Sequence, residues 1–253
     1  MTKILAALLL AFGLALPALA DNFSADQKGE IESIVKAYLL EHPEVIRDAI
    51  VALDAKEKKD AAQAQANSLN DSAKAIMHSD VDGVVGNPKG DVTMVEFMDY
   101  NCGWCKKGIK EVQTLVQSDK NVRIVMKEFP IFGHTSEYAA KAALASVKQG
   151  KYWELHQALF VATLPRDNDA AGEAAVEKIA KSVGIDVAKM KDDMKTPAII
   201  DAIAANVDLA QKLQFTGTPG FNIDNKVYPG YIPLDEMTAG LASVRANGGC
   251  KVC

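Results

Sequence analysis

The chain has 253 residues, of which 49% are hydrophobic and 24% charged, a composition typical of a globular protein and not of a disordered or collagen-like one. Its formal charge is −5, from 33 acidic and 28 basic residues, whereas nucleic-acid-binding proteins usually carry a basic surplus. Nucleic acid is therefore excluded as a preferred partner, and the length allows one or two domains.

Residues 1–20 (MTKILAALLLAFGLALPALA) have the pattern of a cleavable export signal. Lys3 supplies the positive charge, residues 4–16 form the apolar stretch, and residues 18–20 are a small-residue cleavage site. The alternative is a membrane anchor, but the apolar stretch is shorter than the ~20 residues that a bilayer requires. We therefore expect a mature protein that starts at Asp21 and is soluble in the periplasm, where thiols are subject to oxidation.

Residues 21–78 are expected to form an N-terminal helical segment. Ser24 and Gln27 have capping-box spacing, and apolar residues then recur at helical intervals. Pro43 marks the start of a second helix, and residues 55–66 are rich in Ala, Lys and Gln with almost no large apolar side chain. The segment is therefore either a cap packed on the main domain or a self-association segment joined to it by a helical linker.

Residues 79–253 show the order of elements of a thioredoxin-like domain. Residues 92–98 read as a buried central strand, and residues 122–126 predict a second strand. A Cys-x-x-Cys motif and an amphipathic helix lie between them, which gives a βαβ unit with a redox motif. A helical block at about 135–213 precedes a β-hairpin and a last helix, so we expect an inserted all-helical domain.

The four cysteines form two Cys-x-x-Cys pairs, Cys102 with Cys105 and Cys250 with Cys253. Closing so short a loop constrains the unfolded chain little, so redox exchange or metal binding is favoured over a structural role. Cys102 stands where the strand gives way to the helix, and a helix N-terminus lowers the pKa of a thiol. We expect Cys102 to be the attacking sulfur and Cys105 the resolving one. A Cys₄ zinc site built from both pairs is the alternative.

Glu96 is the candidate acid of this site. It lies six residues before Cys102, on the strand face of Met94 and Met98, and is therefore predicted to be buried. A buried carboxyl beneath the dithiol can exchange a proton with Cys105. The alternative role is an ion pair with Lys127 on the neighbouring strand.

Three stretches resemble the DsbA-like periplasmic oxidoreductases. They are residues 95–106 (VEFMDYNCGWCK), 127–131 (KEFPI) and 217–221 (GTPGF), and the resemblance spans about residues 84–248. It implies an α/β thioredoxin fold with an inserted helical domain.

The same resemblance implies roles for individual residues. Cys102 would be the nucleophile, Cys105 the resolving thiol and Glu96 the buried acid. Thr218 and a cis Pro219 would face the dithiol, although spacing alone leaves an X-Pro bond trans. The expected substrate-binding residues are Gly103, Trp104, Thr218 and Pro219.

Residues 38–50 (YLLEHPEVIRDAI) resemble the N-terminal domain of the suppressor-of-copper-sensitivity C proteins. This resemblance implies an N-terminal oligomerisation segment, a homotrimer, and disulfide isomerase or reductase activity on misfolded or oxidised exported proteins. A DsbD-like membrane reductase would keep the dithiol reduced, and no cofactor beyond the Cys102–Cys105 pair is expected. The alternative is a monomeric DsbA-like oxidase that donates its disulfide and is recycled by a quinone-linked membrane oxidase.

Cys250 and Cys253 follow two glycines in a tail that neither resemblance explains. Three interpretations stay open: a local disulfide or an idle pair, a relay dithiol for the main site, or a Cu(I) site, because two thiolates suit a soft metal ion. Cu(I) sequestration in copper tolerance is the third functional hypothesis.

Overall fold

The computed structural model describes residues 23–77 and 80–250, so the expected export signal lies outside the described residues. Within the described ranges, no helix combines the length and apolar character that a membrane span requires. The helices and strands follow in this order: α1 (Ala25–Glu41), α2 (Glu44–Met77), β1 (Gly83–Gly86), β2 (Val92–Met98), α3 (Gly103–Ser118), β3 (Val122–Glu128), α4 (His134–Val147), α5 (Tyr152–Val161), α6 (Asp169–Ser182), α7 (Val187–Asp193), α8 (Pro197–Lys212), β4 (Gly220–Ile223), β5 (Lys226–Pro229) and α9 (Leu234–Ala246).

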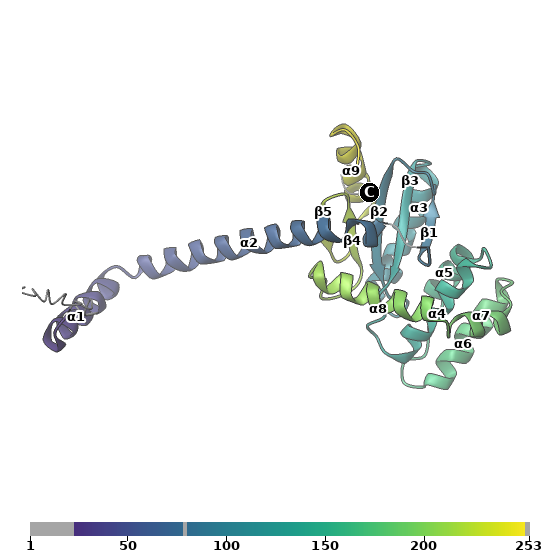
Figure 1. Ribbon diagram of the computed structural model, residues 1–253, viewed down its shortest axis with the longest axis horizontal. Helices are drawn as coiled ribbons and strands as arrows, with labels where there is room; N and C mark the ends of the chain where they lie inside the picture. The colour runs from purple at the N-terminus through teal and green to yellow at the C-terminus, as the bar shows by residue number, and fades with distance from the viewer. Residues whose placement is uncertain (1–22, 78–79, 251–253) are drawn as a thin grey trace, which may run out of the picture. The chain divides into compact units, whose positions relative to one another are not determined.

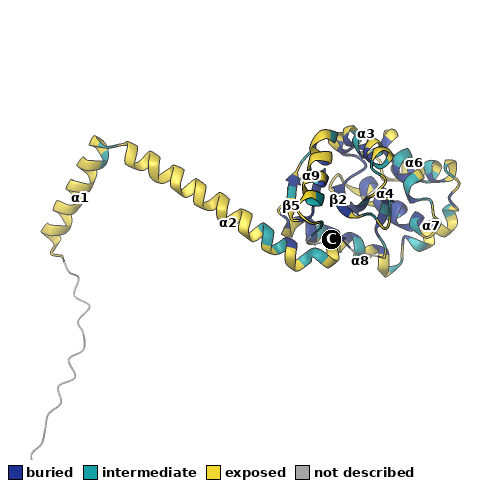
Figure 2. Cartoon of the chain, turned by 90° about the horizontal axis from the view of Figure 1, so that it is seen from above, coloured by how far each residue is buried: buried dark blue, intermediate teal, exposed yellow. Residues whose placement is uncertain are grey.

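The chain divides into two compact units, Met1–Lys58 and Lys59–Cys253. In the first unit, α1 begins with the predicted capping box, in which Gln27 N donates to Ser24 Oγ and Ser24 N donates to Gln27 Oε1. No residue of α1 is buried, and α1 and the start of α2 are exposed except at Leu39, which is partly buried (Figure 2). Their apolar side chains stand in solvent: Phe23, Ile31, Ile34, Val35, Tyr38, Leu40, Val45, Ile46, Ile50, Val51 and Leu53.

The helix α2 runs without a break through the predicted helix after Pro43 and the predicted linker. The Ala-, Lys- and Gln-rich stretch has high helix propensity and contains no Gly or Pro to interrupt it. Its C-terminal end belongs to the second unit, where Leu69, Ile76 and Met77 are buried. This differs from the expected boundary at residue 78, because the last turns of α2 contribute to the core of the second unit.

The described strands form one five-stranded sheet in the order β1-β3-β2-β4-β5. β2 and β3 are parallel and are joined by α3, while the other pairs are antiparallel. Every residue of β2 is buried, as expected for a central strand. The predicted thioredoxin fold is confirmed, and the helical insertion runs from α4 to α8 between β3 and β4 (Figure 1).

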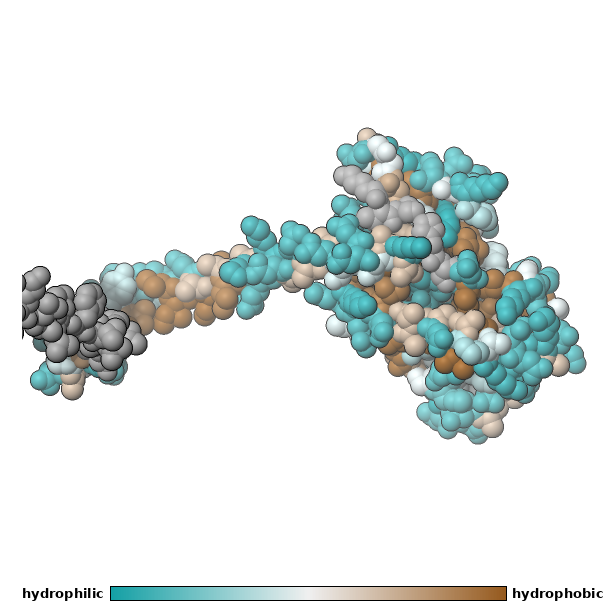
Figure 3. Space-filling view, viewed as in Figure 1, coloured by the Kyte–Doolittle hydropathy of each residue, from teal (hydrophilic) through white to brown (hydrophobic). Residues whose placement is uncertain are grey.

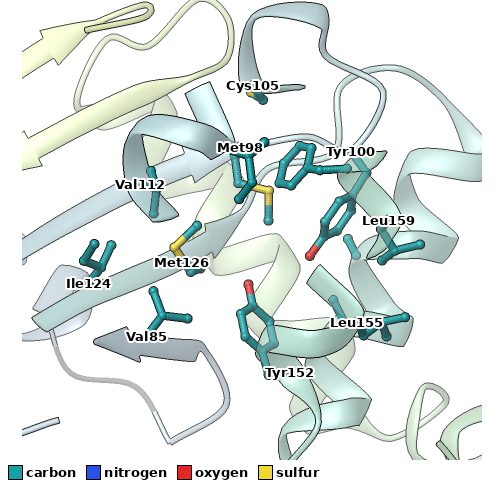
Figure 4. Packing of buried hydrophobic residues seen from close by; sticks show 14 of the residues in the cluster. Val85, Met98, Tyr100, Cys105, Val112, Ile124, Met126, Tyr152, Leu155 and Leu159 are labelled. Atoms are coloured by element: carbon teal, nitrogen blue, oxygen red, sulfur yellow. The ribbon is translucent and has the colours of Figure 1, made fainter. Parts of the chain in front are cut away.

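The two faces of the sheet pack against different helices. On one face Met94 and Met98 join a cluster with residues of α3, α9 and the helical insertion, part of which is seen in Figure 4. On the other face Val95 and Phe97 pack against the C-terminal turns of α2 and the end of α8. Side chains alternate along a strand, so neighbouring residues of β2 enter different clusters.

The strand register corrects the expected alternative role for Glu96. Glu96 lies beside Met126, whereas Lys127 lies beside Phe97 on the opposite face. Lys127 instead forms a buried ion pair with Asp82 and donates to Ala75 O at the end of α2, 2.8 Å away. An ion pair between Glu96 and Lys127 is therefore wrong, because their side chains lie on opposite sides of the sheet.

A buried polar cluster joins the helical insertion to the sheet. Tyr100 and Tyr152 each donate a 3.0 Å hydrogen bond to Oε1 of Glu128, and their hydroxyl groups point toward each other in Figure 4. His156 Nδ1 lies 3.1 Å from the Tyr100 hydroxyl. Burial raises the pKa of Glu128 well above its usual range and lowers that of His156 to about 3, so the imidazole of His156 is uncharged at neutral pH.

Candidate active site

Cys102 occupies the N-cap position of α3, with the extended backbone typical of that position. Its N–H donates to Asp99 O, and the helix begins at Gly103. Cys102 and Cys105 are both free thiols, and both are buried. The end of β2 and the start of α3 thus bring both sulfurs to the positive end of the helix dipole.

The two thiols have opposite pKa shifts. The pKa of Cys102 falls to about 5, chiefly because of a hydrogen bond from Cys105, with further help from the backbone N–H groups of Trp104 and Cys105. Burial raises the pKa of Cys105 well above its usual range. At neutral pH one sulfur is therefore an ionised nucleophile and the other a protonated thiol.

We expect a thiolate titration in the reduced protein with a midpoint near pH 5, followed by ultraviolet thiolate absorbance. Because the folded pKa lies below the ordinary value of 9.0, the thiolate stabilises the reduced fold increasingly from pH 5 up to about pH 9. That contribution is lost as the pH falls through 5. The melting temperature of the reduced protein, relative to the oxidised one, should therefore drop on acidification. A difference that did not change with pH would contradict the shift.

Glu96 lies on β2, with only 2% of its surface exposed. Its pKa is raised to about 8, first by burial and then by the negative charge of Cys102. The carboxyl is therefore largely protonated at neutral pH and can hold or release a proton within about one pH unit of neutrality. The charges of Glu96 and Cys105 also interact, which places the acid near the second thiol.

The loop before β4 faces the dithiol. The Thr218–Pro219 peptide bond is cis, and Cys102 Sγ lies 3.1 Å from Thr218 O, to which it donates when it is protonated. Trp104, Thr218, Gly230 and Tyr231 line a pocket of about 310 Å³ next to this contact. Thr218 Oγ1 is buried, and a hydrogen bond from this side chain helps to lower the pKa of Cys102. The pocket therefore offers aromatic surface and a hydroxyl donor beside the sulfur.

Asp99 is a structural residue of the site that the sequence analysis did not single out. Its carboxylate accepts hydrogen bonds from the backbone of Asn101 (2.6 Å), Ile131 (2.7 Å) and Phe132 (3.1 Å), and from Ser136 Oγ (2.8 Å). These bonds tie the loop that carries Cys102 to the loop after β3 and to α4. An acidic residue between an apolar strand and the Cys-x-x-Cys motif was the available signal.

The C-terminal tail starts far from the dithiol. Cys250 is disulfide-bonded, and its sulfur lies 3.3 Å from Asp224 Oδ1, in the turn between β4 and β5. β4 pairs with β2 so that Ile223 lies beside Met94, toward the end of β2 remote from Cys102. Cys253 lies outside the described residues, and those described contain no group of three or more metal-ligating side chains.

Known proteins resemble both parts of the chain. The DSBA-like thioredoxin domain matches residues 93–242, and the copper resistance protein ScsC N-terminal domain matches residues 27–60. The structure of a thioredoxin-like oxidoreductase from Silicibacter pomeroyi is 40% identical, covering 68% of this chain and 97% of that one, with a TM-score of 0.64. Proteus mirabilis ScsC in a transitional conformation is 27% identical, covering 89% and 98%, with a TM-score of 0.62.

Among curated proteins, a Na⁺/H⁺ antiporter NhaA 3 from Salinispora tropica is 27% identical over 170 residues. This match covers 66% of the chain but only 25% of the antiporter, so the chain spans about a quarter of the length of the curated relatives it matches first. The match to the DSBA-like domain covers more than half of the chain and includes Cys102, Cys105, Glu96, Thr218 and Pro219. The chain therefore belongs to the DSBA-like thioredoxin domain family and carries an N-terminal domain of the ScsC type.

Proposed function

We propose that this chain is a thiol–disulfide oxidoreductase that acts through Cys102 and Cys105. The lowered pKa of Cys102, at the start of α3, is the observation that carries the proposal. The Cys102 thiolate attacks a client disulfide, forms a mixed disulfide and releases one client sulfur as a thiolate. Cys105 then loses its proton, attacks the Cys102 sulfur and releases the second client sulfur. The client is reduced as the Cys102–Cys105 disulfide forms.

Glu96 is proposed to handle the proton of Cys105. Its raised pKa of about 8 lets it accept or return that proton without a strongly unfavourable step. Gly103, Trp104, Thr218 and Pro219 are proposed to hold the client segment, because Thr218 O contacts Cys102 and Trp104 lines the adjoining pocket.

We further propose that the protein is an isomerase or reductase that works as a homotrimer in the periplasm. The exposed apolar side chains of α1 and the first turns of α2 support self-association, because monomeric proteins rarely expose a large contiguous apolar patch. Figure 3 shows such side chains along this part of α2. Several dithiols in one assembly could act on a misfolded exported client, and a DsbD-like membrane reductase would return them to the reduced state.

The second candidate function is that of an oxidase. A pKa of about 5 at Cys102 stabilises the reduced form of the pair, and this makes the corresponding disulfide more oxidising. An oxidase would accumulate with Cys102 and Cys105 joined, whereas an isomerase needs them reduced. Trapping the thiols in intact cells and measuring the oxidised fraction distinguishes the two.

Self-association is tested in the full chain with Ile46→Glu and Ile50→Glu combined. Both side chains are about half exposed, so charge there should dissociate an oligomer without unfolding the catalytic unit. Light scattering should show a trimer becoming a monomer. The rate at which a scrambled disulfide protein is reactivated should fall about 10-fold or more, a change of ~1.4 kcal/mol in activation free energy.

Val161→Glu is the matched control, because this side chain is 84% exposed and lies on the catalytic unit. It should change neither the mass nor the reactivation. A wild-type chain that is already monomeric would overturn the trimer and favour the oxidase.

A further inference from the structure

The rim of the candidate active site is cationic, although the whole chain is acidic. Lys106, Lys107 and Arg166 all lie around Cys102, and in the described part of the chain none of them forms an ion pair with a carboxylate. Many other cations of this protein do have such partners, as Lys141 has in Glu137 and Arg245 in Asp91. An unpaired group of cations at the mouth of a site is available to a ligand.

Lys107 stands on the pocket side of Cys102. Its ammonium nitrogen lies 4.9 Å from the centre of the Trp104 ring and 4.6 Å from that of Tyr231. Both rings line the pocket beside Thr218, and their faces attract a cation. The two rings therefore hold the positive charge of Lys107 next to the groove where a client chain would lie.

Arg166 lies in the loop between α5 and α6. Its guanidinium donates to the backbone oxygen of Asn101, the residue before Cys102, and lies 5.1 Å from the centre of the exposed Phe132 ring. Lys106 is close by, because its backbone N–H donates to Cys102 O; its pKa is lowered by burial and then by the charge of Arg166, while the charge of Asp99 acts in the opposite direction. Its ammonium group donates to Ala162 O at 2.5 Å. Positive charge thus lies on both sides of the reactive sulfur.

Among the described residues, no carboxylate lies within ion-pair distance of Lys106, Lys107 or Arg166. Asp99 is buried and accepts hydrogen bonds from backbone N–H groups. Glu111 accepts a 2.8 Å hydrogen bond from the Tyr231 hydroxyl. Asp167 follows Arg166 in the sequence and is exposed. Their two side chains, both among the described residues, form no ion pair. A client carboxylate therefore meets unpaired cations at this rim.

We propose that Lys107 and Arg166 select client segments that carry acidic residues on the two sides of the reacting cysteine. This inference rests on the proposed thiol–disulfide exchange and names its substrate class. Unlike-charge attraction raises the rate of encounter and falls with ionic strength, whereas apolar contacts with Trp104 and Phe132 would not distinguish the charge of the client.

The test compares two peptides that contain the same disulfide and differ only in the residues flanking its cysteines, Glu in one and Lys in the other. Reduced full-length protein is mixed with each, and the second-order rate is measured at low and high salt. We expect the Glu peptide to react about 10-fold faster than the Lys peptide at low ionic strength. The ratio of these two rates should approach one at high salt. Lys107→Glu and Arg166→Glu should each lower the ratio, and Lys107→Arg should keep it.

Lys110→Glu is the matched control, because Lys110 is an exposed residue of the same helix and makes the same charge change. It should lower the ratio of the two rates less than Lys107→Glu does, because it is Lys107 that is held against Trp104 and Tyr231 at the pocket beside Thr218. Equal rates for both peptides, or an equal loss in the Lys110 variant, would overturn the selection by charge. A neutral small disulfide serves as the reference: failure to react with it as well would instead overturn the proposed exchange activity.

Discussion

A Cys102→Ser protein is expected to lose thiol–disulfide exchange by at least about 1,000-fold, because the nucleophile is removed and no other described free thiol has a lowered pKa. Cys105→Ser should behave differently. Its Cys102 can still attack a client, but no second thiol releases the mixed disulfide. The covalent complex should therefore accumulate and be visible by mass spectrometry or non-reducing electrophoresis.

Two further observations sharpen this result. Cys105→Ser keeps a hydroxyl where Cys105 donates to Cys102, so the thiolate titration should move upward only in part, whereas Cys105→Ala should move it farther toward 9.0. Retained exchange in Cys102→Ser would assign the chemistry to other thiols, and the C-terminal pair would become the candidate. A trapped complex in Cys102→Ser but not in Cys105→Ser would reverse the two proposed roles.

An Asp82→Ala protein is expected to lose about 3–5 kcal/mol of unfolding free energy, the usual cost of leaving one charge of a buried ion pair without its partner. The side chains of Lys127 and Asp82 are 2% and 1% exposed. Asp82 also accepts from Asn206 Nδ2 at 3.2 Å, and Lys127 holds the end of α2 through Ala75 O. Urea unfolding should show a lower midpoint with an unchanged slope.

Asp91→Ala is the matched control, since it removes a carboxylate from an ion pair with Arg245 that is substantially exposed. It should cost less than about 1 kcal/mol. The combined change Asp82→Leu with Lys127→Met should recover most of the loss, because apolar replacement of both charges removes the desolvation cost. An Asp82→Ala loss no larger than that of Asp91→Ala would show that the buried pair is not a major support of the fold.

Local sequence patterns predicted much of the fold. The capping box at Ser24, the apolar run of β2, the Cys-x-x-Cys at the start of α3 and the helical insertion were all predicted from neighbouring residues. These features depend on backbone propensity and on the period of the hydrophobic pattern, which a short stretch of chain carries within itself. Cys102, as the first thiol of a helix, was a candidate nucleophile on the same grounds.

The partners of these residues were decided by the tertiary structure. β2 is buried on both faces, so its pattern gives no indication that Glu96 and Lys127 belong to opposite sides of the sheet. The last turns of α2 were assigned to the N-terminal segment because their few apolar residues give a weak pattern, yet Leu69, Ile76 and Met77 are buried in the second unit. The helix propensity of this stretch says nothing about which surface covers it.

The surroundings of the reactive sulfur depend on contacts that are distant in sequence. Thr218 O reaches Cys102 across 116 residues, and Arg166 reaches Asn101 across 65. The sequence by itself determined which residue types carry the chemistry and in which elements they lie. Only the folded chain decided what each of them touches, because register, helix docking and loop closure are set by the packing of the whole unit and not by any one segment.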